Sequence, residues 1–382
     1  MNEWRKVKLG EIAEVTKLAG FEFTKYIEYV DDGEIIALRA LNLKDGRLDL
    51  TDIKKIKKEI SEKLIRSKLY KDDILLTYTG NGYGDCAIIK EDNKYHLAPN
   101  ICKITANKKI LNPYFLYSFI RTKQFYCHLS NYMVGSSQPT IPMRIIRELV
   151  IPIFNINLQN KIVKILSDID EKIELNNKIN DNLEKQAQLI FKSWFIDFYP
   201  FNNKIPLNWS YTALENIADI SSGRRPSIKK NTSSKDNNVP LIGASGIMGY
   251  TNKTLFNEPI LIIGRVGTLG IVQRIITPCW ASDNTLVIKS KYYEYIFQIL
   301  KNINYENLNR GSTQPLITQN DLKNIQILLP NLNILEEFEK RISSLMKLYN
   351  KNVLENNKLS NLKNYLLPKL MNGEIDVEKV EL

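Results

Sequence analysis

The sequence predicts an α+β protein, in which two globular mixed α/β domains lie in a pseudo-twofold arrangement and are separated by two long helices packed as an antiparallel coiled coil. Three observations predict this fold: an internal duplication, short β-type runs in the first part of each copy, and a long heptad pattern in the second part. The length of 382 residues agrees with it, because a single hydrophobic core rarely grows beyond about 250–300 residues. We expect four segments: a first domain over 1–155, a first spacer helix over 156–200, a second domain over 201–332, and a second spacer helix with the C-terminal tail over 333–382.

The duplication rests on three landmarks that return in the same order. Residues 4–15 return at 209–220, residues 135–139 at 311–315, and residues 176–178 at 356–358, with offsets of 205, 176 and 180. The first landmark opens on a tryptophan, the second reads Gly-Ser-Ser/Thr-Gln-Pro, and the third reads Asn-Asn-Lys. Two copies of so long a unit indicate a duplicated module, since a solenoid needs shorter and more numerous repeats.

The first part of each copy is predicted to be rich in strands. The β-type runs are bounded by Gly, Asn, Asp or Pro and lie at 34–38, 73–78 and 101–104, then at 239–242, 260–263 and 284–288. Further apolar runs close the two domains at 149–152 and 328–330. A glycine cluster separates the second and third strands of each copy: Gly80, Gly82 and Gly84, then Gly264, Gly267 and Gly270.

One helix inside the first domain has a clear start signal. Asn112 is a good N-cap residue and Pro113 suits the first helical position, so the sequence predicts a helix over 114–125.

The second part of each copy predicts a long helix with a coiled-coil seam. The positions of this seam, most of them apolar, follow one another at alternating distances of four and three residues. They are Ile162, Leu166, Ile169, Ile173, Asn176, Asn180, Leu183, Ala187, Ile190 and Trp194, then Ile342, Met346, Tyr349, Val353, Asn356 and Ser360. Polar residues in mid-seam lower stability but fix the register, and here they are Asn176 with Asn180 and Asn356 with Ser360. The helices pack either against each other, antiparallel, or each on its own domain.

Composition and charge narrow the function classes. The formal net charge of +11 favours a polyanionic partner. The chain has two histidines that do not correspond between the copies, and four cysteines without a C-x-x-C pair, so we expect no metal site, no disulfide framework and no duplicated histidine-based active site. The polar N-terminus and the lack of a long apolar run predict a cytoplasmic protein that does not bind membranes.

Motifs that suggest catalysis are better explained by structure. The cluster after Tyr78 lacks the spacing and the lysine of a phosphate-binding loop and is followed by a strand at 86–89, which favours a β-turn. Residues 112–115 resemble the Asn-Pro-Pro-Tyr/Phe motif of adenine methyltransferases with one proline missing, and the helix-start interpretation fits them better. The carboxylates of Asp72, Asp73 and Asp197 do not form the pattern of a metal nuclease. We therefore expect no catalytic residues in this chain.

The remaining interpretation is DNA binding through loops between strands, with Lys and Arg holding phosphates and Arg, Asn or Gln reading base edges. The candidates are Arg39, Asn42, Lys44, Arg47, Thr79, Asn81, Tyr83, Ser136, Ser137 and Gln138 in the first copy, and Arg224, Arg225, Ser245, Arg265, Thr268, Ser312, Thr313 and Gln314 in the second. The alternative for each is an ordinary surface residue, and the repeated Gly-Ser-Ser/Thr-Gln-Pro segment could equally be a structural turn.

These landmarks resemble the specificity (S) subunits of type I restriction–modification systems over nearly the whole chain. The resemblance is carried by four segments: 4–15 at the domain opening, 135–138 with Ile151-Pro152, 189–198 at the helix end with its Phe-Lys-Ser-Trp-Phe-Ile-Asp-Phe run, and 366–375 near the C-terminus. Family members often carry Glu-Gln before the first conserved helix, where this chain has Leu158-Gln159 and, in the second copy, Glu336-Glu337.

The resemblance implies a two-domain reader of double-stranded DNA without catalytic activity of its own. Each target recognition domain would read one half of a split target, and the helices would set the gap and dock two methyltransferase (M) subunits, which hold S-adenosylmethionine; restriction (R) subunits would complete the complex. Apolar helix residues could serve as the docking surface or pack in the core: Phe191, Trp194, Phe195, Phe198, Leu366, Leu367 and Leu370. A helix of roughly 37 residues spans ~55 Å, so we expect half-sites about one to one and a half DNA turns apart.

Two other functions stay open at this point. One is a fused or standalone DNA-modifying enzyme, either an adenine methyltransferase or a nuclease, which would need a cofactor fold that the first domain does not predict. The other is a coiled-coil scaffold without sequence reading.

Overall fold

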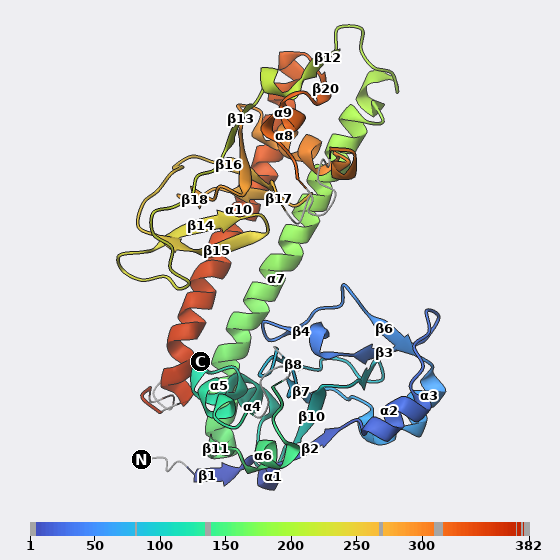
Figure 1. Cartoon of the computed structure of the whole chain (residues 1–382), viewed down its shortest axis with the longest axis vertical. Helices are drawn as coiled ribbons and strands as arrows, with labels where there is room; N and C mark the ends of the chain where they lie inside the picture. Colours follow the sequence, from blue (N-terminus) through green and yellow to red (C-terminus); the bar gives the residue numbers. More distant parts are fainter. Residues whose placement is uncertain are drawn as a thin grey trace. The chain divides into compact units, whose positions relative to one another are not determined.

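A computed structural model describes residues 5–80, 82–133, 139–266, 270–308, 316–371, 373–375 and 377 (Figure 1). The chain divides into two compact units. Unit 1 comprises Met1–Ile173 and Asn357–Leu382, and unit 2 comprises Glu174–Asn356. Each unit therefore contains one strand-rich part and one half of each long helix. The four segments expected from the sequence divide the chain differently, and their limits stay a prediction.

Unit 1 contains three small sheets and a hairpin. The N-terminal strand β1 (Arg5–Lys8) pairs with the closing strand β11 (Val150–Ile153), so the domain opening and closing segments meet. The main sheet has the order β2 (Ala13–Lys17), β10 (Ile101–Ala106), β7 (Ile74–Thr77), β8 (Cys86–Ile88), and the small sheet has the order β6 (Lys54–Ile56), β3 (Ile35–Leu38), β9 (Tyr95–Leu97). The hairpin is β4 (Leu43–Lys44) with β5 (Arg47–Leu48).

Short helices surround these strands. They are α1 (Leu9–Ile12), α2 (Gly20–Tyr26), α3 (Lys58–Lys63), α4 (Pro113–Ile120), α5 (Lys123–Ser130) and α6 (Met143–Glu148), with 3₁₀ turns η1 (Ala40–Asn42) and η2 (Ile65–Ser67).

The described part of unit 2 repeats the topology of the three sheets, without the hairpin. Strand β12 (Ser210–Ala213) pairs with β20 (Gln326–Leu329). The main sheet has the order β13 (Asp219–Ser222), β19 (Thr285–Lys289), β16 (Ile260–Gly264), β17 (Val272–Ile275). The small sheet has the order β15 (Gly246–Thr251), β14 (Val239–Gly243), β18 (Trp280–Ala281). Its helices are α8 (Tyr293–Lys301) and α9 (Gln319–Lys323), with 3₁₀ turns η3 (Tyr199–Phe201), η4 (Leu214–Asn216) and η5 (Tyr305–Leu308). In both small sheets one pair is parallel, β3 with β9 and β14 with β18. The duplication is therefore a duplication of fold.

The longer first copy is explained by two connections. Between β3 and β6 the first unit has η1 and the β4–β5 hairpin, whereas β14 and β15 join through a tight turn. Between β6 and β7 it has α3 and η2, where the described part of unit 2 has an irregular segment.

The predicted helix over 114–125 is two helices. Asn112 caps α4 as expected, since its side-chain oxygen accepts the backbone N–H groups of Tyr114 and Phe115. The helix ends at Ile120, and Thr122 begins α5 by accepting the backbone N–H of Phe125 at 3.1 Å. A second good N-cap residue in mid-segment therefore divides the run.

Two 40-residue helices, α7 (Ile156–Phe195) and α10 (Leu332–Met371), are antiparallel within each unit (Figure 1). In unit 2, Asn176 contacts Asn356 and Asn180 contacts Asn352. Residue numbers therefore increase along α7 in the direction in which they decrease along α10, as in an antiparallel pair. In unit 1, the Lys363 ammonium bonds the Asp170 carboxylate. This confirms the predicted α+β class with a pair of long antiparallel helices; the pseudo-twofold placement of the domains stays a prediction.

The predicted seam is largely correct and wrong at Ser360. All ten predicted α7 positions are buried except Ile190, which is half-buried. On α10, Ser360 is exposed, and the buried polar residues are Asn352 and Lys363. Each half of the helix pair also completes the core of its unit: Ile162 and Leu370 pack in the first, Phe191 and Phe338 in the second. Packing between the helices and packing on the domains therefore occur together.

Candidate nucleic-acid interface

Residues that flank the loops selected from the sequence pair in the same way in both units. In unit 1 the backbone N–H of Tyr78 donates to the carbonyl of Asn100 at 3.1 Å, and the Tyr78 carbonyl accepts the N–H of Ile141 at 2.9 Å. In unit 2 Arg265 makes the same two bonds, to Asn284 at 2.8 Å and from Ile317 at 3.0 Å. We call these places the loop junctions.

Each loop junction joins the end of a main-sheet strand to the segment that follows the repeated Gly-Ser-Ser/Thr-Gln-Pro turn. Isolated bridges extend both, from Thr79 to Thr140 and from Val266 to Leu316. The residues that follow the main-sheet strand are thus paired with residues that come directly after the repeated segment and are distant in sequence. Eight candidate readers lie outside the described residues: Asn81, Ser136, Ser137, Gln138, Thr268, Ser312, Thr313 and Gln314.

The glycine cluster of unit 1 is a β-turn that presents a tyrosine pair. Gly84 has φ +88° and a Cβ there would lie 3.0 Å from the Tyr126 ring, so both its conformation and its contact need glycine. Tyr83 stacks on Tyr126 with ring centroids 5.3 Å apart, and the Tyr126 hydroxyl donates to that of Tyr83 at 2.7 Å. This bond, more than burial, raises the pKa of Tyr126 to about 12, and the exposed Tyr126 ring offers an aromatic surface beside the half-buried Tyr83.

The β4–β5 hairpin, which the sequence reasoning did not predict, carries two of the candidate cations. Lys44 and Arg47 are exposed and directly opposite each other in the ladder. Between them Asp45 and Gly46 have φ values of +52° and +78°, the two positive values of a type I′ turn. The Asp-Gly pair was the available sequence signal. Since the Tyr117 hydroxyl donates to the Gly46 carbonyl at 2.5 Å, the turn is held in place.

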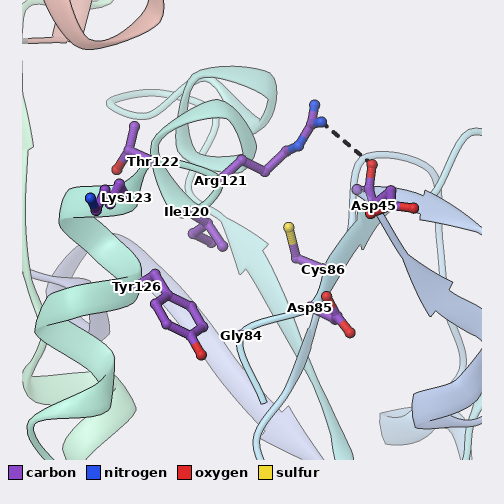
Figure 2. A pocket seen from close by; sticks show the side chains of 10 residues that line it. Asp45, Gly84, Asp85, Cys86, Ile120, Arg121, Thr122, Lys123 and Tyr126 are labelled. Atoms are coloured by element: carbon purple, nitrogen blue, oxygen red, sulfur yellow. Dashed lines mark hydrogen bonds between the residues drawn. The ribbon is translucent and has the colours of Figure 1, made fainter. Parts of the chain in front are cut away.

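An open pocket of about 430 Å³ lies between this turn, the glycine cluster and the start of α5 (Figure 2). Figure 2 shows Arg121 reaching toward Asp45, whose carbonyl oxygen it bonds at 3.4 Å. Asp85 also lines the pocket, and burial, followed by the charge of Asp45, raises the pKa of its carboxyl. Burial also raises the pKa of the Cys86 thiol to about 12, so this sulfur is not an activated nucleophile. Cations and carboxylates together can bind hydrogen-bonding groups but do not resemble a catalytic set.

Two candidate readers at η1, the N-cap residue Arg39 and the last residue Asn42, have other contacts. Asn42 is fully buried, and its amide nitrogen donates to the carbonyls of Asp49 and Asp52 at 2.9 and 2.8 Å. Its oxygen accepts the backbone N–H of Arg39 at 2.9 Å. Asn42 therefore holds this loop together and has no free amide hydrogen for a base, which corrects the expectation of base reading. The Arg39 guanidinium bonds the Asp52 carboxylate at 2.9 Å and stays 21% exposed.

The described candidates of unit 2 lie on two loops and at the junction. Arg224 and Arg225 are exposed on the connection between β13 and β14, and Ser245 is exposed at the β14–β15 turn. The Gln273 amide donates to the carbonyls of Gly243 and Ala244 and so fixes that turn.

A second pocket, of about 320 Å³, joins the β14–β15 turn to Val266 and Asn284 at the junction. Two buried donors have no partner among the described residues: the hydroxyl of Ser282, which lines this pocket, and Nε of the half-buried Arg265 at the junction. Buried unpaired donors are costly unless a ligand or water completes them, so this junction is suited to hydrogen bonding with a bound polar group.

The candidate partner-docking residues are mostly buried. Phe191, Trp194 and Phe195 pack in the core of unit 2, Leu367 and Leu370 in that of unit 1, and Phe198 and Leu366 are half-buried at their edges. The exposed apolar residues of the long helices are others, which the sequence reasoning missed: Leu175, Leu189, Leu332, Leu348, Leu354, Leu362 and Tyr365. The sequence could have indicated them, because they are apolar residues of the predicted helices that lie outside the heptad seam.

The described part of the chain has neither a metal-binding group of side chains nor a membrane-spanning helix. It contains no group of three or more His, Cys, Asp or Glu side chains placed to bind a metal ion. None of its helices is long and apolar enough to cross a membrane.

A family profile, two curated relatives and a solved structure that resemble this chain are all type I specificity proteins. A family profile described as "Type I restriction modification DNA specificity domain" matches twice, at residues 1–185 and 206–364. The HindI specificity subunit of Haemophilus influenzae is 23% identical over 98% of this chain and 100% of its own length, and the MjaIX specificity subunit of Methanocaldococcus jannaschii is 26% identical over 70% of each. The crystal structure of the type I S subunit from M. genitalium has a TM-score of 0.60 at 15% identity, covering 97% of this chain and 96% of that one, which supports the fold.

Proposed function

Because this chain belongs to the family of type I restriction–modification DNA specificity proteins, we propose that each of its two domains reads one half of a split DNA target. The chain is a specificity subunit and is not the catalytic component of such a system. Reading by two similar domains explains why the fold is duplicated while the loop residues differ, since two copies of one scaffold can present different side chains to two different half-sites.

The observation that carries this proposal is the pair of loop junctions. In both units the same backbone bonds join the residue after the main-sheet strand to a residue just after the repeated Gly-Ser-Ser/Thr-Gln-Pro segment. Hydrogen bonds to the end of a main-sheet strand fix the described ends of both segments, and a fixed backbone of this kind is what sequence reading needs. The surrounding cations, such as Lys44 and Arg47 in unit 1 and Arg224 and Arg225 in unit 2, would contact phosphates or bases.

The long helices would hold the gap between the half-sites and dock two methyltransferase subunits. The exposed leucines of α7 and α10, among them Leu175 and Leu189, support docking of a partner helix, since apolar residues outside the seam are not used by the pair itself. The methyltransferase subunits would hold S-adenosylmethionine and methylate adenine, and restriction subunits would bind to the same assembly. We expect this assembly in the cytoplasm, where host DNA lies.

The test is to express the chain with its cognate methyltransferase subunits and to map methylated adenines by sequencing the host DNA. We expect one asymmetric motif made of two short half-sites at a fixed distance. A continuous motif, or methylation without sequence preference, would contradict two-domain reading. The purified chain alone should neither methylate nor cut DNA; if it did either, it would be a DNA-modifying enzyme.

A further inference from the structure

The connection from the main sheet to the small sheet has opposite charge in the two units. In unit 2, residues 223–238 between β13 and β14 contain five Lys or Arg and one acid, a formal charge of +4. In unit 1, residues 18–34 between β2 and β3 contain one Lys and five acids, a formal charge of −4. We call these segments the basic connection and the acidic connection.

The two connections are equivalent in the fold. Each leaves the edge strand of the main sheet and enters the middle strand of the small sheet. On the way each makes one antiparallel bridge to the same neighbouring strand, from Val30 to Lys55 in unit 1 and from Lys230 to Tyr250 in unit 2. The charge difference therefore lies at one structural position and reflects a difference between the domains.

The backbone of the basic connection is held at two points, Arg224 and Lys230. At the first point, Arg224 donates its N–H to the Ala281 carbonyl at 2.9 Å and accepts the Trp280 indole N–H at 2.7 Å. At the second, Lys230 exchanges two backbone bonds with Tyr250, at 2.9 and 2.8 Å. The connection runs beside the β14–β15 sheet (Figure 1).

The side chains of the basic connection are free to bind anions. All five cations are exposed: Arg224, Arg225, Lys229, Lys230 and Lys235. In the part of the chain that the structure describes, none of the five forms an ion pair. Exposed cations on a fixed backbone lose less conformational freedom when they bind a polyanion than cations on a flexible tail would.

We propose that the basic connection binds the phosphate backbone of the DNA next to the half-site read by the second domain, and that the first domain has no such contact at the equivalent position. This proposal rests on the proposed function and adds an asymmetry to it. The acidic connection itself offers no comparable set of cations, so this phosphate contact would belong to the second domain. In this proposal the pockets and loop junctions recognise the bases of the target. The basic connection adds affinity for DNA of any sequence and makes that affinity depend on salt.

The experiment uses the full-length chain assembled with its methyltransferase subunits and two labelled duplexes, one with the target and one with both half-sites scrambled. The variant is Lys229→Gln/Lys230→Gln/Lys235→Gln. Each lost phosphate contact lowers the magnitude of the slope of log affinity against log salt by about 0.9, so we expect a decrease of about 2–3 for both duplexes. The ratio of their affinities should not change, because no base contact is removed.

A matched control removes the same charge from the exposed face of a helix in the same unit, as Lys340→Gln/Lys347→Gln/Lys351→Gln. It should leave the slope within experimental error of the wild type. Unfolding curves of both variants show whether they remain folded, which is expected because all six lysines are exposed.

The outcomes separate this proposal from the proposed function. Unchanged salt slope with intact target preference would overturn the phosphate contact and leave two-domain reading in place. Weaker assembly with the methyltransferase subunits at an unchanged slope would assign the basic connection to a protein partner and equally overturn it. Failure of the wild-type assembly to distinguish the two duplexes would instead overturn the proposed function.

Discussion

At the scale of single residues, one helix position anchors each domain to its long helix. Gln159 on α7 accepts the N–H of Asn112 before α4 and donates to the carbonyls of Ile110 and Phe154, at 2.8–2.9 Å. Glu339 lies 180 residues later, the offset of the helix repeat, and accepts the N–H groups of Glu294 and Tyr295 at the start of α8. Since Tyr292 gives α8 no side-chain cap, Glu339 supplies it from the neighbouring helix.

The contribution of Glu339, the anchor in the second copy, to the stability of the fold should depend on pH. Burial, and to a smaller extent the charge of Glu294, raises the pKa of Glu339 from 4.5 to about 7. A carboxyl with a raised pKa takes up a proton on folding, so its contribution to stability is present below pH 4.5 and is lost as pH rises toward and through 7. Glu339→Gln, which installs the residue of the first copy, should therefore raise the free energy of unfolding at pH 8 by about 1–3 kcal/mol and at pH 5 by much less.

Urea unfolding of wild type and variant at the two pH values measures this difference. Glu337→Gln is the control, because Glu337 is an exposed carboxylate on the same helix and should change stability little at either pH. Equal effects of Glu339→Gln at both pH values would contradict the argument.

At the scale of elements, buried asparagines fix how α7 and α10 pair in unit 2. The Asn352 amide donates to the Asn180 oxygen at 2.9 Å, with the side chains 5% and 6% exposed, and the Asn180 amide donates to the Tyr349 carbonyl. A polar pair in an apolar seam specifies the register because any shift leaves buried groups without partners.

Substitution of this pair should be strongly non-additive. Asn352→Leu alone leaves the Asn180 oxygen buried and unpaired, so it should lower the free energy of unfolding by about 1–3 kcal/mol. Asn180→Leu/Asn352→Leu removes both groups and should be more stable than either single variant. A double-mutant cycle measures this, with exposed Asn182→Leu as a control that should have little effect. Additive losses would show that the pair does not act as a unit.

At the scale of the whole molecule, the length of the helix pair should determine the gap in the DNA target. Adding one heptad to α7 and the matching heptad to α10 keeps the seam in phase and adds ~10 Å at ~1.5 Å per residue. At ~3.4 Å per base pair we expect the permitted gap to grow by about three base pairs, with both half-sites unchanged. The modified-adenine motif of a host carrying this variant reports the gap, and an unchanged gap would argue against the spacer role.

The sequence predicted the features that depend on local patterns. The duplication, the positions of six strands along the chain, the Asn112 cap and the α7 seam follow from repeats, composition and periodicity, and the structure has them. Asn42 and Ser360 could not be placed, because their burial depends on contacts formed by the folded chain and on neighbours outside their own segments. The anchor at Gln159 was also missed, since its partners lie on a distant loop.

The most direct measurement of two-domain reading is a domain exchange. Residues 1–155 are replaced by the first domain of a family member with a known, different target, and the methylated adenines of the host are mapped with the cognate methyltransferase subunits present. We predict that one half-site changes to that of the donor while the other half-site and the gap stay as in the wild type. A change in both half-sites, or in neither, would contradict the claim that each unit reads its own half of the target.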